Sequence, residues 1–444
     1  MLAPLTRPES ALFWVAPLDQ STEFTPEDPL ALDYLSQQVG LWLFANLTTR
    51  TSRAQNYAVV LYGLDLADKA ITEYRLASDD ETREKLFERW ERFWALAVLE
   101  SREGNLSRGD PDAMRGVLGA KRHWRKGTGP LGLDFKLISR QTELGSLGAY
   151  LSSLRAYRLV VPGTLRVSAA GRDIVEAFWD EAGNPRTGSY ESYALRALDQ
   201  KHPQIDRKHS GISLERVGER SRLTALGELG RRPQQARLWK ALFEGAHDYT
   251  LTLAGFLRSA SKAGVEEPRE FLEAALQQRW GPVEPELHEQ LEVALRFGDV
   301  RWELLSRFNA MYGHVWESGW KARRSDTVAS AFPRAALASL QTACQALYDV
   351  AGKHRFQSLD VHGQPFLRLV DFLRTAGPSD AFEAIFRFHQ DVQRSRRGGG
   401  SWIREEGDQL VMGLASYSGF RQEPDFPSFK FNVVRQLMRD LGKL

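Results

Sequence analysis

The residues of this chain that are best suited to bind a charged ligand are basic, and they gather in one stretch. Between residues 115 and 172 the sequence holds eleven lysines and arginines against two acidic residues, Asp134 and Glu143, which gives a formal charge of +9. The whole chain of 444 residues carries only +2, so the rest of the sequence is acidic on balance. Because a local excess of positive charge favours phosphate groups, the stretch predicts a nucleic-acid partner, with DNA favoured over RNA.

One hexapeptide in this stretch combines the two chemistries that nucleic-acid binding uses. Residues 121–126, Lys-Arg-His-Trp-Arg-Lys, place an indole among basic groups, so phosphate neutralisation and base stacking are available together. We therefore expect the nucleic-acid contacts to come from basic and aromatic side chains between residues 121 and 166. The candidate binding residues are Lys121, Arg122, Trp124, Arg125, Lys126, Arg140, Tyr150, Arg155, Arg158 and Arg166.

Two other functions fit parts of the same stretch. Asp112, Asp134 and Lys136 resemble the acidic-acidic-lysine pattern of restriction-type metal nucleases, in which two carboxylates bind a divalent ion and the lysine orients a water molecule. That resemblance implies a metal-dependent nuclease. In the second alternative the basic surface meets an acidic protein partner, and the chain is a pure protein–protein scaffold.

Other motifs that carry chemistry are incomplete in this sequence. The chain has no GxxxxGK[ST] phosphate loop, and residues 127–132 spell GxGxxG without the preceding strand that dinucleotide binding requires. The single cysteine, Cys344, excludes an internal disulfide, and leucines at helical spacing around it predict a buried thiol. The nine histidines show no metal-ligand spacing, so we expect no cofactor, no metal and, on balance, no enzyme.

The sequence also lacks the patterns of membrane insertion and secretion. No stretch approaches the roughly 20 apolar residues that a membrane-spanning helix needs. Residues 1–8 contain no basic region followed by an apolar run, which a signal peptide would show. We therefore expect a cytoplasmic protein with no membrane partner.

The elements that must position the candidate residues are mostly helical. The strongest pattern covers residues 79–99, where apolar residues recur every three or four positions and charged residues fill the opposite side. Ser78 and Glu81 have the spacing of a capping box, which predicts the start of this helix. We expect its apolar face to belong to the core, and this face consists of Leu86, Phe87, Trp90, Phe93, Trp94, Ala97 and Val98.

Residues 137–180 follow the order helix, short hairpin, helix. Leucines at helical spacing come first, two short runs of valine and leucine then flank the turn Pro162-Gly163, and a second helix opens near Gly171. This order resembles a winged helix-turn-helix module. The resemblance implies that DNA meets the outward side of the first of these helices and the wing. The residues concerned are Ser146, Tyr150, Ser153 and Arg155 on the helix, and Thr164 and Arg166 on the wing.

These patterns together predict a mainly α, multidomain helical protein with an embedded winged-helix-like module and a small C-terminal α+β segment. We expect strands only in hairpins at 160–168 and 402–412, with small additions. The predicted segments are an N-terminal helical domain at 1–112, a basic winged-helix-like domain at 113–185, a helical domain at 186–380 and a helix-hairpin-helix segment at 381–444.

The function expected from this organisation is binding rather than catalysis. A large helical protein with a basic module and no catalytic motif is typical of an adaptor or scaffold. We therefore expect a non-enzymatic, nucleic-acid-associated subunit of a bacterial multiprotein assembly, with further protein subunits as partners. Genome maintenance and antiviral defence against phage are the settings that such a subunit would fit.

Overall fold

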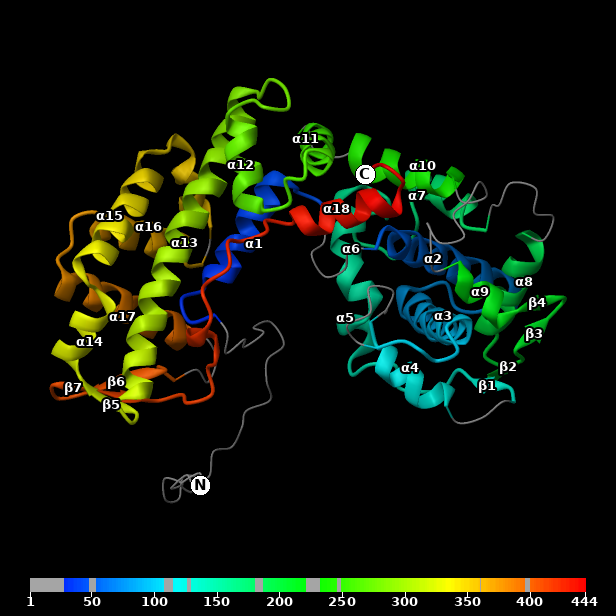
Figure 1. Ribbon diagram of the computed structural model, residues 1–444. Coiled ribbons are helices and arrows are strands. Elements are labelled where there is room, and N and C mark those ends of the chain that lie inside the picture. The colour runs from blue at the N-terminus through cyan, green and yellow to red at the C-terminus, as the bar shows by residue number, and fades with distance from the viewer. Residues whose placement is uncertain are drawn as a thin grey trace, which may run out of the picture. The chain divides into compact units, whose positions relative to one another are not determined.

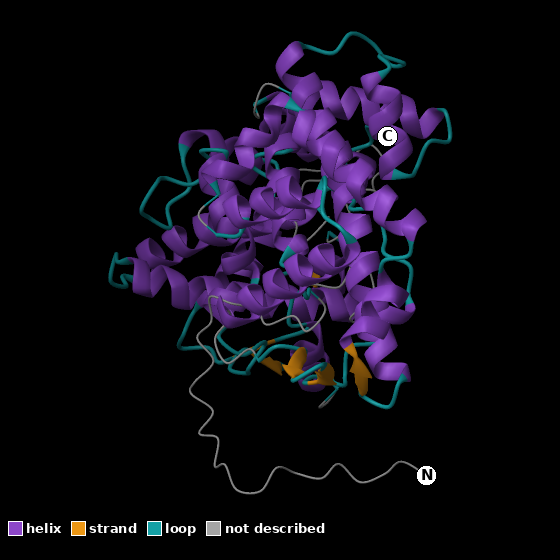
Figure 2. Cartoon of the chain, turned by 90° about the vertical axis from the view of Figure 1, so that its left-hand side faces the viewer, coloured by secondary structure: helices purple, strands orange, loops and turns teal. Residues whose placement is uncertain are grey.

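The computed structural model describes residues 28–47, 53–107, 115–125, 129–179, 187–220, 232–245, 249–359, 361–395 and 400–444. Helices make up most of this described part, and its strands are few and short (Figure 2). The expectation of a mainly helical protein with a small C-terminal sheet segment is therefore confirmed. Two of the residues singled out from the sequence, Asp112 and Lys126, lie outside the described residues.

The chain divides into two compact units, each made of two separate stretches. Unit 1 contains residues 1–38 and 292–427, and unit 2 contains residues 39–291 and 428–444. The first two unit boundaries fall within helices α1 (Leu32–Leu43) and α13 (Pro285–Glu317), and the third lies between residues 427 and 428. The four domain segments expected from the sequence stay a prediction. One of their boundaries, between residues 380 and 381, lies inside helix α17 (Pro378–Ser395) of unit 1.

Unit 2 is helical, with two small antiparallel sheets in which β1 pairs with β2 and β3 pairs with β4. A five-residue π-helix, Lys240–Glu244, continues α10. The elements of unit 2 are α2 (Ala54–Tyr74), α3 (Asp80–Ser101), α4 (Val117–Trp124), β1 (Leu131–Gly132), α5 (Gln141–Leu144), α6 (Ser146–Ala156), α7 (Ala169–Glu176), α8 (Thr187–Leu198), β2 (Gln204–Ile205), β3 (Lys208–His209), β4 (Ile212–Ser213), α9 (Leu214–Glu219), α10 (Arg232–Trp239), α11 (Thr250–Lys262), α12 (Pro268–Leu276) and α18 (Phe431–Asp440).

The core of unit 2 forms where α2 and α3 pack against each other. The apolar face of α3 predicted from the sequence is buried, and its Trp90 and Trp94 lie in one aromatic cluster with Tyr62 and Phe178. Gly63 on α2 leaves room for this cluster, because a Cβ at that position would lie 2.1 Å from Cδ1 of Trp90. The prediction that this aromatic face is core is confirmed.

The start of α3 differs by one residue from the predicted capping box. The carboxylate of Asp79 accepts a hydrogen bond from the backbone N–H of Thr82 at 2.7 Å and caps the helix. The hydroxyl of Ser78 accepts instead from Nη2 of Arg83 at 3.1 Å. Aspartate and serine are both strong N-caps, so their order in the sequence alone does not decide which of them takes the cap position.

The C-terminal helix α18 completes unit 2 by capping its first core helix. The carboxylate of Asp440, which is buried, accepts hydrogen bonds from Nε of Arg53 at 2.8 Å and from the backbone N–H of Ala54 at 3.0 Å. Ala54 is the first residue of α2, so this carboxylate satisfies a backbone donor that no residue within the helix can reach. Residues 386 positions apart in the sequence are therefore joined at one helix end.

Unit 1 combines a helical layer with a three-stranded antiparallel sheet of order β5-β7-β6. Strands β6 and β7 form the hairpin predicted at 402–412, and Gly407 turns it at a φ of +66°. In Figure 1 the sheet lies at one end of α13, α14 and α17. The other elements of unit 1 are β5 (Lys321–Arg323), α14 (Arg324–Ala331), α15 (Arg334–Asp349), the 3-10 helix Ala351–Ser358, α16 (Gly363–Leu373), α17 (Pro378–Ser395), β6 (Ile403–Glu406), β7 (Gln409–Met412) and the 3-10 helix Gly419–Arg421.

The single cysteine lies in the core of unit 1, as predicted. Cys344 is buried in α15 together with Leu340 and Leu347. Burial raises the pKa of its thiol to about 12, so the thiol stays protonated at neutral pH. Because the thiolate is the reactive form of cysteine, this side chain acts as a small apolar group.

Candidate nucleic-acid interface

The predicted order of helix, hairpin and helix is present in α6, residues 160–167 and α7. The hairpin is minimal: Val160 and Val167 form an isolated antiparallel bridge, and the N–H of Val161 donates to the carbonyl of Arg166 at 2.9 Å. Gly163 in the turn has a φ of +74°, a conformation that glycine adopts without steric cost. The order of elements is confirmed, and the winged-helix resemblance itself stays a prediction.

Side-chain hydrogen bonds fix the hairpin to both helices. The hydroxyl of Ser168 caps α7 by accepting from the N–H of Gly171 at 3.2 Å, and it donates to the carbonyl of Arg158 at the end of α6 at 2.6 Å. From the other side, Nη2 of Arg155 donates to the carbonyl of Thr164 at 2.9 Å. Arg155, expected to contact DNA, is therefore directed at the backbone of the hairpin turn.

The beginning of α6 is anchored by a buried carboxylate from α3. Oε1 of Glu91 accepts from the N–H of Ser146 at 2.6 Å, and Oε2 accepts from Nε2 of Gln141 at 2.7 Å. Glu91 is only 4% exposed, and burial raises the pKa of its carboxyl group. The helix that carries the hairpin thus depends on a polar contact inside unit 2.

The expected outward orientation of Tyr150 and Ser153 on α6 is wrong. Tyr150 is 1% exposed and meets the ring of Tyr57 edge-on, with 4.9 Å between ring centroids. Ser153 is also buried, and its hydroxyl donates to the carbonyl of Asn46. Both side chains face α2 because α6 packs on that helix. The exposed positions of α6 carry only small residues without charge, namely Gly148, Ser152 and Ala156.

Three arginines of this module remain available to a ligand, and we term them the hairpin group: Arg158, Arg166 and Arg172. Each is exposed, and none forms an ion pair with another described residue. Arg158 follows α6 with a φ of +57°, where the N–H of Leu159 bonds back to the carbonyl of Leu154 at 2.8 Å. Arg166 comes from the hairpin and Arg172 from α7, so the three charges stand on three linked elements.

A second set of basic residues, termed the α4 group, surrounds α4 and the loop after β1. It consists of Lys121, Arg122, Arg125, Lys136 and Arg140. Two of them have partners inside unit 2: Nζ of Lys121 donates to the carbonyl of Leu106 at 2.8 Å, and Arg140 lies 3.1 Å from the carboxylate of Glu143. The other three are exposed and form no ion pair within the described part of the chain.

The aromatic residues beside the α4 group are engaged within unit 2. Nε1 of Trp124 donates to a carboxylate oxygen of Glu100 at 2.7 Å, and its ring covers Gly104, where a Cβ would lie 2.3 Å from Cζ3. His123 stacks on Phe135 with 4.3 Å between ring centroids. Trp124 therefore already uses its ring and its N–H in contacts with its own chain, which argues against the base-stacking role expected from the sequence.

The two basic sets occupy different sides of unit 2. Helix α4 packs on α3, whereas α7 packs on α2. In Figure 1 these two helices lie on opposite sides of the α2–α3 pair. The α4 group and the hairpin group, which are close together in the sequence, thus lie on two separate surfaces. Arg172, which was not among the expected binding residues, joins the hairpin group because the cap at Ser168 begins α7 just before it.

The nuclease pattern is only partly within the described residues. Asp134 and Lys136 are exposed in the loop after β1, and Asp112 lies outside the description, so the pattern as a whole stays a prediction. Among the described residues, no group of three or more His, Cys, Asp and Glu side chains is placed to hold a metal ion.

None of the described helices is long and apolar enough to span a membrane.

Comparisons with known proteins add no further identification. No protein-family model, curated protein or solved structure matches this chain.

Proposed function

We propose that unit 2 binds nucleic acid through the hairpin group, and that the chain is a non-enzymatic adaptor or scaffold subunit of a bacterial multiprotein assembly. The supporting observation is that Arg158, Arg166 and Arg172 are exposed, without acidic partners among the described residues, on one cross-bridged module. An arginine with no internal partner keeps its five N–H donors for phosphate oxygens.

The expected contact is with the phosphate backbone rather than with base edges. Long polar side chains on a helix are the usual readers of bases in the major groove. The exposed side of α6 offers only Gly148, Ser152 and Ala156, which are too short for that role. Phosphate contacts position a protein without specifying sequence, so the protein would bind DNA of any sequence with similar affinity. Such binding suits a subunit in genome maintenance or phage defence whose partners supply specificity.

A pair of charge-matched variants tests this proposal. In the first variant the hairpin group, Arg158, Arg166 and Arg172, is changed to alanine. In the second variant the exposed members of the α4 group, Arg122, Arg125 and Lys136, are changed to alanine. Each variant therefore loses three positive charges. Binding of a fluorescent duplex to the full chain is measured by anisotropy at several salt concentrations. We expect the first variant to lose affinity on the order of 10²-fold at about 0.1 M salt, with a salt slope smaller by about 2.7. The second variant should bind within about threefold of the parent and should keep the parent's salt slope. A phosphate contact from any one of its three residues would show as a salt slope smaller by about 0.9.

The alternative functions predict different outcomes. Equal losses in both variants would mean that net charge, not the hairpin group, governs binding. If the parent binds no duplex or single strand at low salt, the proposal fails and a scaffold with an acidic protein partner takes its place. Cleavage of the duplex in Mg²⁺ that disappears in Asp134→Asn would instead favour the nuclease.

A further inference from the structure

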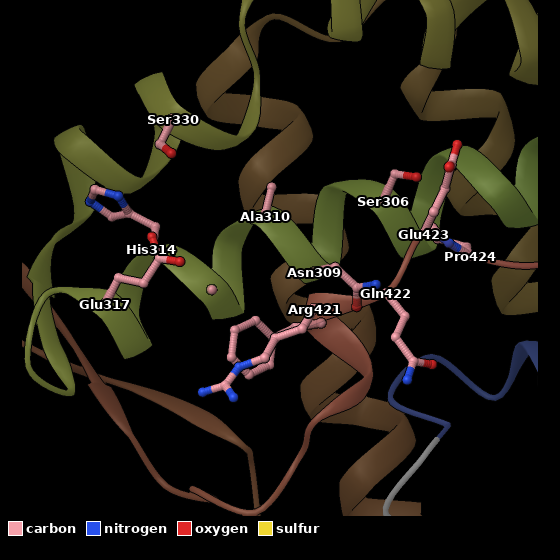
Figure 3. Close-up of a pocket in the computed structure, with 12 residues that line it drawn as sticks. Ser306, Asn309, Ala310, His314, Glu317, Ser330, Arg421, Gln422, Glu423 and Pro424 are labelled. Atoms are coloured by element: carbon pink, nitrogen blue, oxygen red, sulfur yellow. The ribbon is translucent and has the colours of Figure 1, made fainter.

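A cleft of about 430 Å³ lies within unit 1, between one face of α13 and the segment 420–424 (Figure 3). Six of the residues that line it, from Ser306 to Glu317, recur at helical spacing along α13. Small residues occupy the middle of this face, and at Gly313 a Cβ would lie 3.2 Å from Cδ2 of Phe420. The cleft therefore exists because α13 lacks bulk where the segment 420–424 approaches it. Its volume is in the range of small-molecule sites, about 300–1,000 Å³.

One wall of the cleft presents a positioned cation. The guanidinium carbon of Arg421 lies 5.5 Å from the ring centroid of Trp316 and 5.2 Å from that of Phe420. Arg421 is exposed and has no ion pair with a described residue. Contact with two rings restricts the guanidinium while leaving its N–H donors free, which suits bidentate binding of a carboxylate or phosphate.

An acidic group on α13 lines the same cleft as this cation. Figure 3 shows Glu317 and the Arg421 guanidinium at the same end of the cleft, with His314 one turn earlier on α13. Glu317 is exposed and, like Arg421, has no ion pair within the described part of the chain. Elsewhere in unit 1, exposed arginines are commonly paired, as in Arg404–Glu406 at 2.9 Å and Arg394–Asp391 at 2.9 Å. An acid and a base that are not paired with each other at one end of a cleft leave room for a ligand that carries both opposite charges.

The other end of the cleft is polar, and hydrogen bonds of Asn309 fix the backbone beside it. Asn309 is 8% exposed; its Oδ1 accepts from the hydroxyl of Tyr417 at 2.9 Å, and its Nδ2 donates to the carbonyl of Gly419 at 3.4 Å. These bonds hold the turn that carries Arg421. Gln422 and Glu423 line the same region, so a ligand that extends from Arg421 along the cleft meets hydrogen-bonding groups rather than an apolar pocket.

We propose that this cleft binds a small zwitterion, in which a carboxylate or phosphate pairs with Arg421 and a neighbouring ammonium pairs with Glu317. The polar far end favours a ligand with a hydrogen-bonding side chain. Amino acids and phosphorylated amines both have this chemistry. The proposal is independent of nucleic-acid binding, because it rests on unit 1 and on none of the residues of the hairpin group.

Isothermal titration calorimetry on the full chain tests the site with two probes, L-glutamine for amino acids and O-phosphoethanolamine for phosphorylated amines. We expect Arg421→Gln and Glu317→Gln each to weaken binding of the effective probe by about tenfold or more, the loss typical of a charged hydrogen bond. Acetate, which has no ammonium, should bind the parent more weakly than the zwitterion and should not be weakened by Glu317→Gln, which removes a negative charge. Arg368→Gln is the matched control, because Arg368 is an exposed arginine of α16 with no ion pair among the described residues.

The outcomes are separable. Binding of one probe alone identifies the ligand class. The proposal is overturned if neither probe binds at millimolar concentration, if acetate binds as tightly as the zwitterions, or if Arg368→Gln is as harmful as Arg421→Gln. Melting curves establish that the variants are folded. Duplex binding measured on Arg421→Gln should equal that of the parent, so failure at the cleft leaves the proposed function standing.

Discussion

The hairpin group and the α4 group carry similar charge in neighbouring parts of the sequence, yet the fold uses them differently. Around α4, the carbonyl of Leu106 accepts a hydrogen bond from the ammonium of Lys121, and the carboxylate of Glu100 accepts one from the indole N–H of Trp124. On α6, Nη2 of Arg155 donates to the backbone of the hairpin turn. Three basic side chains of each group stay exposed without an ion pair among the described residues, but only those of the hairpin group stand on a module that Ser168 and Arg155 cross-bridge. The availability of a basic side chain thus depends on which acceptors the tertiary structure places within its reach.

The largest expected effect is on stability, at Trp124 beside the α4 group. Changing Trp124 to alanine removes the contact with Gly104 and leaves Glu100 without one donor. We expect the free energy of unfolding to fall by about 2 kcal/mol, less than the ~3–5 kcal/mol of a fully buried tryptophan. Urea denaturation measures this loss. Duplex affinity, measured where the variant is still folded, should not change; a weakened affinity would show that Trp124 does contact nucleic acid and that the two groups are not distinct.

The second effect is a pH dependence at the base of the hairpin module. Burial raises the pKa of Glu91, so the folded state holds its proton to higher pH than the unfolded chain. The extra stability that this raised pKa gives is fully present below the ordinary pKa of glutamate and is lost as the pH rises through the pKa of the folded state. The loss is about 1.4 kcal/mol for each pH unit between the pKa values of the unfolded and folded states. Glu91→Gln does not titrate. The difference in unfolding free energy, variant minus parent, should therefore increase from pH 4 to pH 8 in urea titrations; a constant difference would contradict a raised pKa of the buried Glu91 carboxyl group.

A smaller loss is expected from the link between the hairpin and its helices. Ser168→Ala removes the N-cap of α7 and the bond to the Arg158 carbonyl, which should lower the unfolding free energy by about 1 kcal/mol. Because the same bonds hold Arg158 and Arg172 in place, duplex affinity should fall although no charge is lost. Ser152→Ala, on the exposed side of α6, is the control and should alter neither quantity. Unchanged binding in Ser168→Ala would mean that the hairpin group needs no rigid support.

The smallest change in stability is a gain, and it separates folding from binding. Arg158 has a φ of +57°, a conformation that costs an L-residue about 1 kcal/mol more than glycine. Arg158→Gly should therefore raise the unfolding free energy by up to about 1 kcal/mol while weakening duplex binding about eightfold at ~0.1 M salt through loss of one phosphate contact. A variant that is more stable and binds as tightly as the parent would remove Arg158 from the interface.

Local periodicity accounts for what could be predicted from the sequence. The aromatic face of α3 and the burial of Cys344 follow from apolar residues every three or four positions, a pattern that seldom has another cause. The burial of Tyr150 was within reach of the same rule, because Tyr150 lies on the helical face shared by Leu147 and Leu154. Its polar hydroxyl and the basic surroundings favoured an outward assignment that the spacing itself did not support.

The features that could not be predicted depend on residues far apart in the chain. Ser153 is buried by a bond to Asn46, and the two basic sets separate because α4 and α7 pack on different helices. The cleft joins α13 to residues more than a hundred positions later. Its sequence signal, the small residues Ala310 and Gly313 in the middle of a long amphipathic helix, indicates a close approach without showing what approaches.

The cap that Asp440 places on α2 has a consequence for the order of events during synthesis. Ala54 leaves the ribosome 386 residues before the carboxylate that completes its helix end. At a synthesis rate of about 5–20 residues per second, the first core helix of unit 2 waits roughly 20 to 80 s for this partner. Both stretches of unit 1 are synthesised before residue 428. Unit 1 can therefore close first, while unit 2 exposes an incomplete core to chaperones until α18 emerges.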